Sequence, residues 1–129
     1  MRRAALWTPA LSGPAVPARV LAASGAVLAA CAVALGAYAS HAADADAGRR
    51  LSLAAAFAFG HGLALAALAP HTTRALGRAS LWMLLAGVLL FAGSLAGAHA
   101  FGWPTRLAPA GGMLMIAGWL LRAVDMARG

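Results

Sequence analysis

The sequence predicts an all-α integral membrane protein, built as a four-helix antiparallel transmembrane bundle. Of its 129 residues, 63% are hydrophobic and 10% are charged, whereas soluble domains have roughly 45–50% hydrophobic and about 25% charged residues. Four long segments carry no formal charge, and arginines stand between them. Ten basic and three acidic residues are too few to cover a soluble globule. The composition therefore argues against an ordinary soluble enzyme.

The first two predicted spans cover residues 20–41 and 51–69. No charged residue lies between Arg19 and Asp44, and about 20 helical residues cross a hydrocarbon core of about 30 Å. The second span follows Arg50 and ends before Pro70, because proline cannot continue a helix. Both segments are therefore long enough to cross a membrane.

The third predicted span covers residues 81–101 and is framed by Trp82 and Trp103, since tryptophan anchors helices at membrane interfaces. The fourth covers residues 107–124 and is short, because only residues 107–121 separate two arginines. Those arginines can extend their side chains toward the interface, and Arg122 with Asp125 has the i,i+3 spacing of a helical ion pair. We therefore expect this segment to span as well.

The arginines predict the orientation. Short loops make successive helices antiparallel neighbours, and cytoplasmic loops carry the arginine excess. We expect both termini in the cytoplasm, with residues 1–19 as a disordered tail and residues 125–129 as a short one. The inner side then holds the larger group, Arg2, Arg3, Arg19, Arg74, Arg78, Arg122 and Arg128, and the outer side holds Arg49, Arg50 and Arg106.

Processing of the first segment is an alternative to a retained helix. Arginines ahead of an apolar run are typical of a secretory signal, and Leu28–Cys31 resembles a lipoprotein cleavage motif. The apolar run is longer than the roughly 7–15 residues of a signal sequence. The sequence therefore favours the retained helix.

The net charge of +7 raises nucleic acid as a partner. The arginines bracket the apolar segments and no three are adjacent, so we expect no nucleic acid to bind. The predicted partners are the lipid bilayer and either another membrane protein or a second copy of this chain. No acidic residue lies in a predicted span, which argues against a proton-coupled exporter.

His61 is the candidate functional residue inside the membrane. It lies ten residues into the second span, about 15 Å deep at 1.5 Å per residue, and an intramembrane ionisable group is a functional hypothesis by default. His41 and Tyr38 lie near the outer face and are offset from it, whereas a metal or haem site needs ligands at one depth. We therefore predict no metal site. The simpler interpretation is a neutral His61 that hydrogen-bonds a neighbouring helix.

Small residues recur at helical spacing and predict close helix packing. The rows include Gly36 in the first span and Gly60 in the second. Gly93 and Gly97 form a GxxxG motif in the third span, with Ser94 inside it. Packing within the chain is the expected use, and self-association is the alternative.

Four motifs together resemble one family. They are residues 35–41, 57–61, 91–95 and 109–112, the last followed by Gly118 and Trp119. The family is the domain-of-unknown-function 423 family of small bacterial inner-membrane proteins of the YgdD type, and the chain is similar also to transmembrane protein 256 of animals. The resemblance covers about residues 20–124.

The resemblance implies a bacterial inner-membrane location and adds Gly111, Gly112, Gly118 and Trp119 to the expected packing residues. His61 matches the family's second motif, where Phe57 stands for a tyrosine and Ala58 for a glutamine. If those polar side chains worked with the histidine, this chain would be impaired. The family carries no established activity.

The leading functional hypothesis is a non-enzymatic accessory or stabilising membrane protein. The alternative is a binding protein for a small molecule or redox-linked cofactor that uses His61 with His41 and Tyr38; the cofactor itself is unknown. A minor alternative is a minimal transporter or channel lined by Ser94 and His61.

Overall fold

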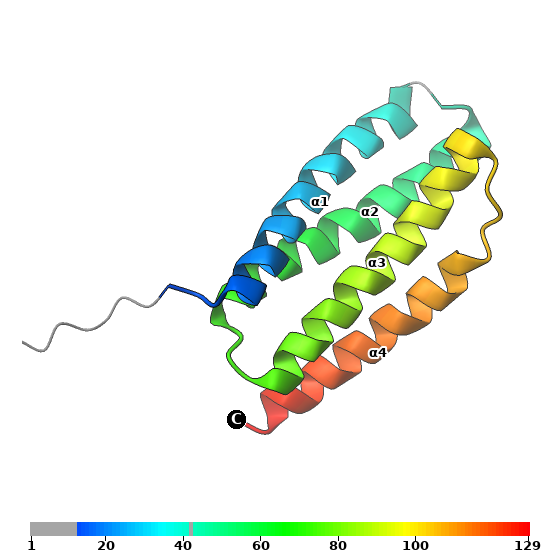
Figure 1. The fold of residues 1–129 in the computed structure, drawn as a ribbon. Coiled ribbons are helices and arrows are strands. Elements are labelled where there is room, and N and C mark those ends of the chain that lie inside the picture. The colour runs from blue at the N-terminus through cyan, green and yellow to red at the C-terminus, as the bar shows by residue number, and fades with distance from the viewer. Residues whose placement is uncertain (1–12, 42) are drawn as a thin grey trace, which may run out of the picture.

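The computed structural model describes residues 13–41 and 43–129, which form four long helices (Figure 1). They are α1 (Val16–His41), α2 (Ala45–Leu68), α3 (Ala75–Phe101) and α4 (Leu107–Ala127), with a single 3₁₀ turn, η1 (Ala69–His71), after α2. All four long helices are long and apolar enough to cross a membrane. No strand occurs among the described residues. The predicted fold class is confirmed.

The helices extend beyond the predicted spans. α1 begins at Val16 and α2 at Ala45, and α3 begins at Ala75, because a helix can continue past the hydrocarbon core into the interface, where arginines are solvated. The expected tails shorten accordingly: residues 16–19 are helical, and α4 includes residues 125–127. Residues 1–12 of the expected N-terminal tail lie outside the described residues.

Local sequence explains where α2 begins and where α3 ends. Asp44 is the N-cap of α2, and its carboxylate accepts hydrogen bonds from the backbone N–H groups of Asp46 at 3.1 Å and Ala47 at 2.9 Å. The bond from Ala47 lowers the pKa of the Asp44 carboxyl below its ordinary value. Gly102 ends α3 with a φ of +66°, a left-handed conformation that glycine adopts without strain.

The four helices pack as two antiparallel hairpins, α1–α2 and α3–α4, joined by contacts between α2 and α3 (Figure 1). Each hairpin closes on a pair of glycines. A methyl group at Gly25 would lie 2.5 Å from the Gly62 carbonyl oxygen, and one at Gly111 would lie 2.6 Å from the Gly87 carbonyl oxygen. Glycine at these positions lets the backbones approach closely.

The glycines that hold the hairpins together differ in part from those predicted. Nothing lies within 4 Å of a methyl group placed at Gly60, Gly93 or Gly112, so the prediction that they pack helices within the chain is wrong. Gly60 and Gly93 are exposed and Gly112 is half-buried, and residue spacing alone cannot distinguish a packed helix face from an open one. Gly36 makes ordinary contact with Ala55, Gly97 lies under the Trp103 ring, and Gly118 meets Leu84.

The bundle is open on one side. α4 packs along α3, while its backbone stays apart from α1 and α2. The fully buried side chains therefore gather mainly on the three other helices, at Leu21, Leu51, Leu65, Leu81, Leu84 and Val88.

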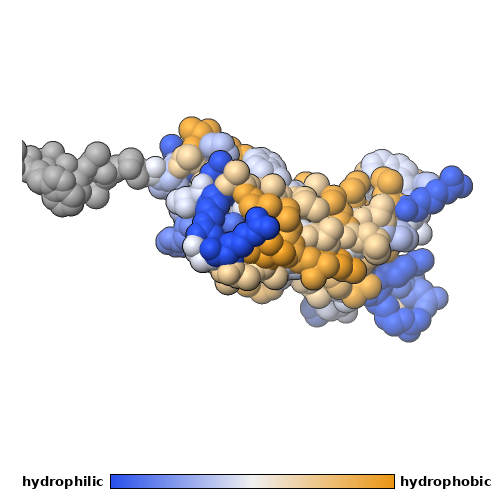
Figure 2. Space-filling view, turned by 90° about the horizontal axis from the view of Figure 1, so that it is seen from below, coloured by the Kyte–Doolittle hydropathy of each residue, from blue (hydrophilic) through white to orange (hydrophobic). Residues whose placement is uncertain are grey.

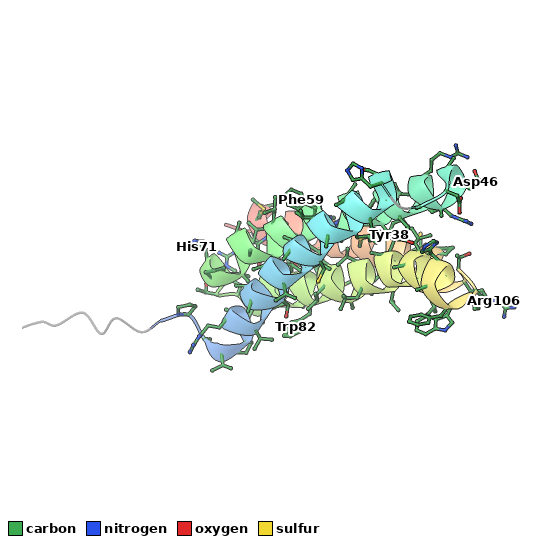
Figure 3. All side chains as sticks on the ribbon, turned by 90° about the horizontal axis from the view of Figure 1, so that it is seen from above. Tyr38, Asp46, Phe59, His71, Trp82 and Arg106 are labelled. Carbon is green, nitrogen blue, oxygen red and sulfur yellow. The ribbon has the colours of Figure 1, made fainter. Side chains whose placement is uncertain are left out.

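On the face shown in Figure 2, apolar side chains form a band across the middle of the molecule, and hydrophilic residues lie at its two ends. Asp46 and Arg106 lie at one end and His71 lies at the other (Figure 3). This distribution is that of a chain whose four helices cross a bilayer.

Candidate functional site

A groove on the open side of the bundle contains the candidate residue His61. The groove has a volume of about 490 Å³ and lies between α2, α3 and α4. It exists because α4 follows α3 and leaves a gap beside α2. We call it the His61 groove; its lining residues are Phe57, His61, Phe91, Gly112, Met115, Ile116, Trp119 and Leu120.

Both ring nitrogens of His61 are hydrogen-bonded. Trp119 Nε1–H on α4 donates to His61 Nε2 at 3.1 Å, and the Phe57 carbonyl oxygen lies 2.9 Å from His61 Nδ1. A carbonyl can only accept, so Nδ1 carries the proton and Nε2 offers its lone pair to the indole. His61 is thus the neutral Nδ1–H tautomer, and it makes the interhelical hydrogen bond that the simpler interpretation expected.

Aromatic rings surround this hydrogen bond. The Phe57 and His61 rings stack with their centroids 5.9 Å apart and an interplanar angle of 9°, and Phe57 meets Phe91 of α3 at 4.8 Å. The Trp119 ring lies 6.0 Å from that of His61. Side chains from three helices therefore form one wall, whose only polar groups are already bonded to each other or to the backbone.

His41 and Tyr38 do not join His61, so the predicted grouping of these three residues is wrong. Gly25 of α1 lies opposite Gly62, and His41, the last residue of α1, is roughly 24 Å further along the helix at 1.5 Å per residue. The Tyr38 hydroxyl is instead 2.9 Å from His99 Nε2 on α3. His99 belongs to none of the four motifs that carry the family resemblance, so no motif indicated this pair.

Ser94 lines a separate cavity of about 500 Å³ near the α3–α4 loop. Ser94 is 7% exposed, and its Oγ has no hydrogen-bond partner among the described residues. Ser94 and His61 therefore do not line a common path, which removes the arrangement that the channel hypothesis assumed.

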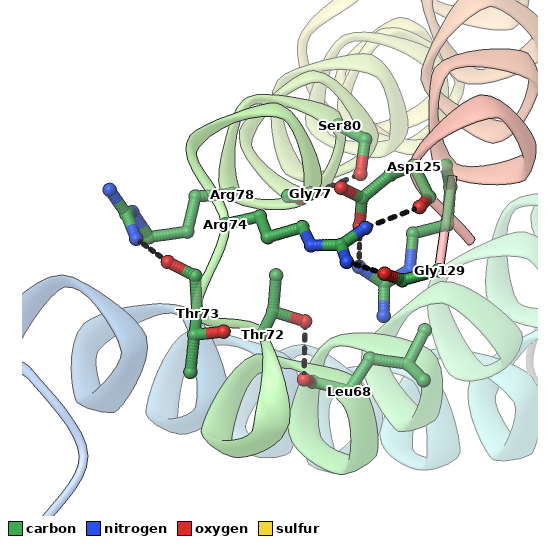
Figure 4. Close-up of polar contacts among 10 residues, drawn as sticks. Leu68, Thr72, Thr73, Arg74, Gly77, Arg78, Ser80, Asp125 and Gly129 are labelled. Atoms are coloured by element: carbon green, nitrogen blue, oxygen red, sulfur yellow. Dashed lines mark hydrogen bonds and ion pairs between the residues drawn. The ribbon is translucent and has the colours of Figure 1, made fainter. Parts of the chain in front are cut away.

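A polar network closes the opposite end of the α3–α4 hairpin (Figure 4). Arg122 and Asp125 form the predicted i,i+3 ion pair at 3.1 Å, with only 11% and 9% of their side chains exposed. Arg74 donates to the backbone carbonyl oxygens of Asp125, at 3.1 Å, and Gly129. The sequence placed Asp125 in a tail, whereas it is buried in the last turn of α4. Arg74 therefore caps α4 while Arg122 neutralises the buried acid.

No group of three His, Cys, Asp or Glu side chains that could hold a metal ion occurs in the described part of the chain. Trp119 was predicted only as a packing residue, and its role as a donor to His61 was missed. Its motif position carried no indication of the helix it faces.

The chain matches the family model described as a protein of unknown function, DUF423, over residues 35–112. This range contains His61 and half of the residues that line its groove. No curated protein matches the chain, and no solved structure does so either.

Proposed function

Because this chain belongs to the DUF423 family of proteins of unknown function and has four helices able to cross a membrane, we propose that it is a non-enzymatic accessory or stabilising membrane protein. It acts by lateral contact with another membrane component, and the His61 groove is its contact surface. Its location is the bacterial inner membrane.

The observation that carries the proposal is the open side of the bundle. Ile116 and Leu120 of α4 are 57% and 65% exposed and line the groove together with α2 and α3. Lipid tails are as apolar as these side chains, so helix association in a membrane depends on shape and close packing. A groove between three helices offers such a shape to a fourth helix from another protein.

The bonding of His61 supports a structural use of the ring. Both nitrogens are occupied, so coordination of a metal at Nε2 would require loss of the hydrogen bond from Trp119. This hydrogen bond joins α4 to α2 across the groove. It thereby fixes the distance between these two helices.

The orientation remains part of the proposal, with both ends of the chain in the cytoplasm. The start of α1, the α2–α3 connection and the end of α4 share one end of the molecule (Figure 1). Among the described residues, that end carries the larger group of arginines, Arg19, Arg74, Arg78, Arg122 and Arg128. Labelling of single cysteines placed in the loops of the intact membrane measures this orientation.

Photo-crosslinking in the native membrane tests the contact surface. A photoreactive residue at Leu120 should capture a specific membrane polypeptide, whereas the same residue at Val33, which is 62% exposed on α1, should not. The captured polypeptide should become less abundant in cells that lack this chain. Equal capture from both positions, or an unchanged abundance, contradicts the proposal.

A matched pair of glycine variants sharpens the test. Gly112 lines the groove and Gly60 does not, and a side chain at either position meets no atom within 4 Å of its Cβ. Gly112→Leu should fill the groove and reproduce the loss of the captured polypeptide. Gly60→Leu should leave its abundance normal.

The size of the groove favours one second candidate, a binding protein for an apolar small molecule. A volume of about 490 Å³ is within the range of small-molecule sites. Native mass spectrometry of the detergent-purified protein should then show a defined non-lipid mass. That mass should disappear in His61→Ala; if it persists, this candidate is wrong.

A further inference from the structure

The second cavity of the α3–α4 hairpin combines apolar walls with unused hydrogen-bond donors. We call it the Arg106 groove, and it has a volume of about 500 Å³. Leu89 and Leu90 of α3 and Leu107 of α4 provide its apolar surface, and Ser94, Trp103 and Arg106 provide its polar groups. It is distinct from the His61 groove, with which it shares no lining residue.

The polar groups lie level with one another along the hairpin. Gly111 packs between Gly87 and Phe91, and the helices are antiparallel. Leu107, one turn before Gly111, therefore lies level with Ser94, about one turn further along α3. Arg106 immediately precedes Leu107, so its backbone stands at the same height.

This height corresponds to the edge of the hydrocarbon core. α4 has 21 residues, a length of about 31 Å at 1.5 Å per residue, which matches a core of about 30 Å. Its first residue therefore lies where acyl chains meet the glycerol and phosphate groups. Arg106 projects at the end of the molecule that also holds Asp46 (Figure 3).

The groove offers donors and positive charge without an acidic counterpart. Neither ion pair found in the described residues involves Arg106, and no acidic side chain lines the groove. Ser94 Oγ is buried without a partner, although a buried hydroxyl without a hydrogen bond is costly. Trp103 is 58% exposed and carries an indole N–H that can donate.

We infer that the Arg106 groove binds an anionic glycerophospholipid. Every polar group of such a lipid's phosphate and ester region is an acceptor, which complements these donors, and a phosphate pairs with a guanidinium through charge-assisted hydrogen bonds. The phosphate binds Arg106, and an acyl chain lies along Leu89 and Leu90. The Ser94 side chain turns toward the groove, where an ester oxygen accepts from its Oγ.

Native mass spectrometry of the full-length protein in mild detergent tests this site. Phosphatidylglycerol should form one retained adduct under collisional activation that removes phosphatidylcholine. Arg106→Gln should weaken phosphatidylglycerol binding about tenfold, the effect of losing one charge-assisted hydrogen bond. Arg50→Gln, an exposed arginine on the same side of the membrane, should leave it unchanged. An equal loss in both variants would mean unspecific attraction and overturns the site.

Two further variants test the remaining parts of the groove. Nothing lies within 4 Å of a Cβ at Gly93, so Gly93→Leu should fill the apolar channel and abolish the adducts of both lipids. Ser94→Ala should weaken both lipids severalfold and yet raise the melting temperature of the delipidated protein, because the unpartnered hydroxyl is gone. Unchanged adducts in both variants overturn the inference.

Inorganic phosphate distinguishes the source of the anion. Millimolar phosphate should not displace phosphatidylglycerol, because the acyl chain contributes much of the binding. Displacement by phosphate alone would assign the site to a free anion and contradict the lipid proposal.

Discussion

In the α1–α2 hairpin Gly25 packs against Gly62, and in the α3–α4 hairpin Gly87 packs against Gly111. Within the described residues, only the second hairpin adds hydrogen bonds between its two ends, from Arg74 to the carbonyl oxygens of Asp125 and Gly129. The Arg106 groove lies on that hairpin, and the His61 groove lies between that hairpin and α2. The glycine contacts set the helix spacing in both pairs, while both grooves are lined mainly by the second one.

Bulky residues at the glycine contacts should lower the free energy of unfolding the most, and by a similar amount in both hairpins. A side chain at Gly62 or Gly111 would overlap backbone atoms at 2.7 Å and 2.5 Å respectively. Gly62→Val and Gly111→Val should each cost about 3 kcal/mol, measured by reversible unfolding in mixed micelles. Gly60→Val and Gly112→Val are the neighbouring controls and should cost less than about 1 kcal/mol. If the unfolding free energies of a variant and its control differ by less than about 1 kcal/mol, the proposed packing of these glycines is wrong.

The buried ion pair of the second hairpin should contribute more to stability than the exposed ion pair of the first. Asp125→Asn leaves Arg122 without its counter-charge at a site where about a tenth of each side chain is exposed. We expect a loss of about 2 kcal/mol. The exposed pair of Asp46 and Arg49 has the same spacing with 76% of each side chain exposed, so Asp46→Asn should change the unfolding free energy by less than about 0.5 kcal/mol. If both variants lose a similar amount of unfolding free energy, burial does not determine how much an ion pair contributes to stability here.

The hydrogen bond from Trp119 to His61, which joins the two hairpins, should contribute still less to the free energy of unfolding. Trp119→Phe keeps an aromatic ring but removes the donor to His61, and an interhelical hydrogen bond in a membrane contributes about 0.6 kcal/mol on average. We expect a loss of about 1 kcal/mol and a change in the histidine ring resonances in NMR spectra. Trp82→Phe, at a tryptophan that is 43% exposed, should cause neither.

The smallest effect should come from the cap of α2. The folded-state pKa of Asp44 is lowered by its hydrogen bond from Ala47, so its stabilisation is present above the ordinary pKa and is lost as pH falls through the lowered one. Asp44→Ala should remove this acid-dependent part and increase hydrogen exchange in the first turn of α2. Identical pH dependence of exchange in the variant and the wild type would contradict this role.

Much of the fold follows from the sequence because membrane spans are determined by length and charge. The four apolar segments, the Arg122–Asp125 pair and an interhelical bond for His61 could all be anticipated. The rotation of each helix could not, since every helix here carries small and apolar residues around its whole circumference. Hence the sequence predicts packing at Gly60, Gly93 and Gly112, where the structure shows none, and does not indicate it at Gly25, Gly62 and Gly87.

The candidate site was less predictable than the fold for the same reason. Depth along a helix is readable from the sequence, and it separated His41 from His61. The pairing of Tyr38 with His99 and of Trp119 with His61 depends on which helices are neighbours. Partners 58 and 61 residues apart leave no local pattern by which to recognise them.

The near absence of contact between α1 and α4 has a consequence for biogenesis. Each helix packs chiefly on the one that precedes or follows it, so the first hairpin can complete its glycine contact before the ribosome has delivered the second. Structures rich in contacts between consecutive elements fold rapidly, and domains that form during synthesis expose fewer unpaired surfaces. Assembly of this protein therefore requires no return of the C-terminal helix to the N-terminal one.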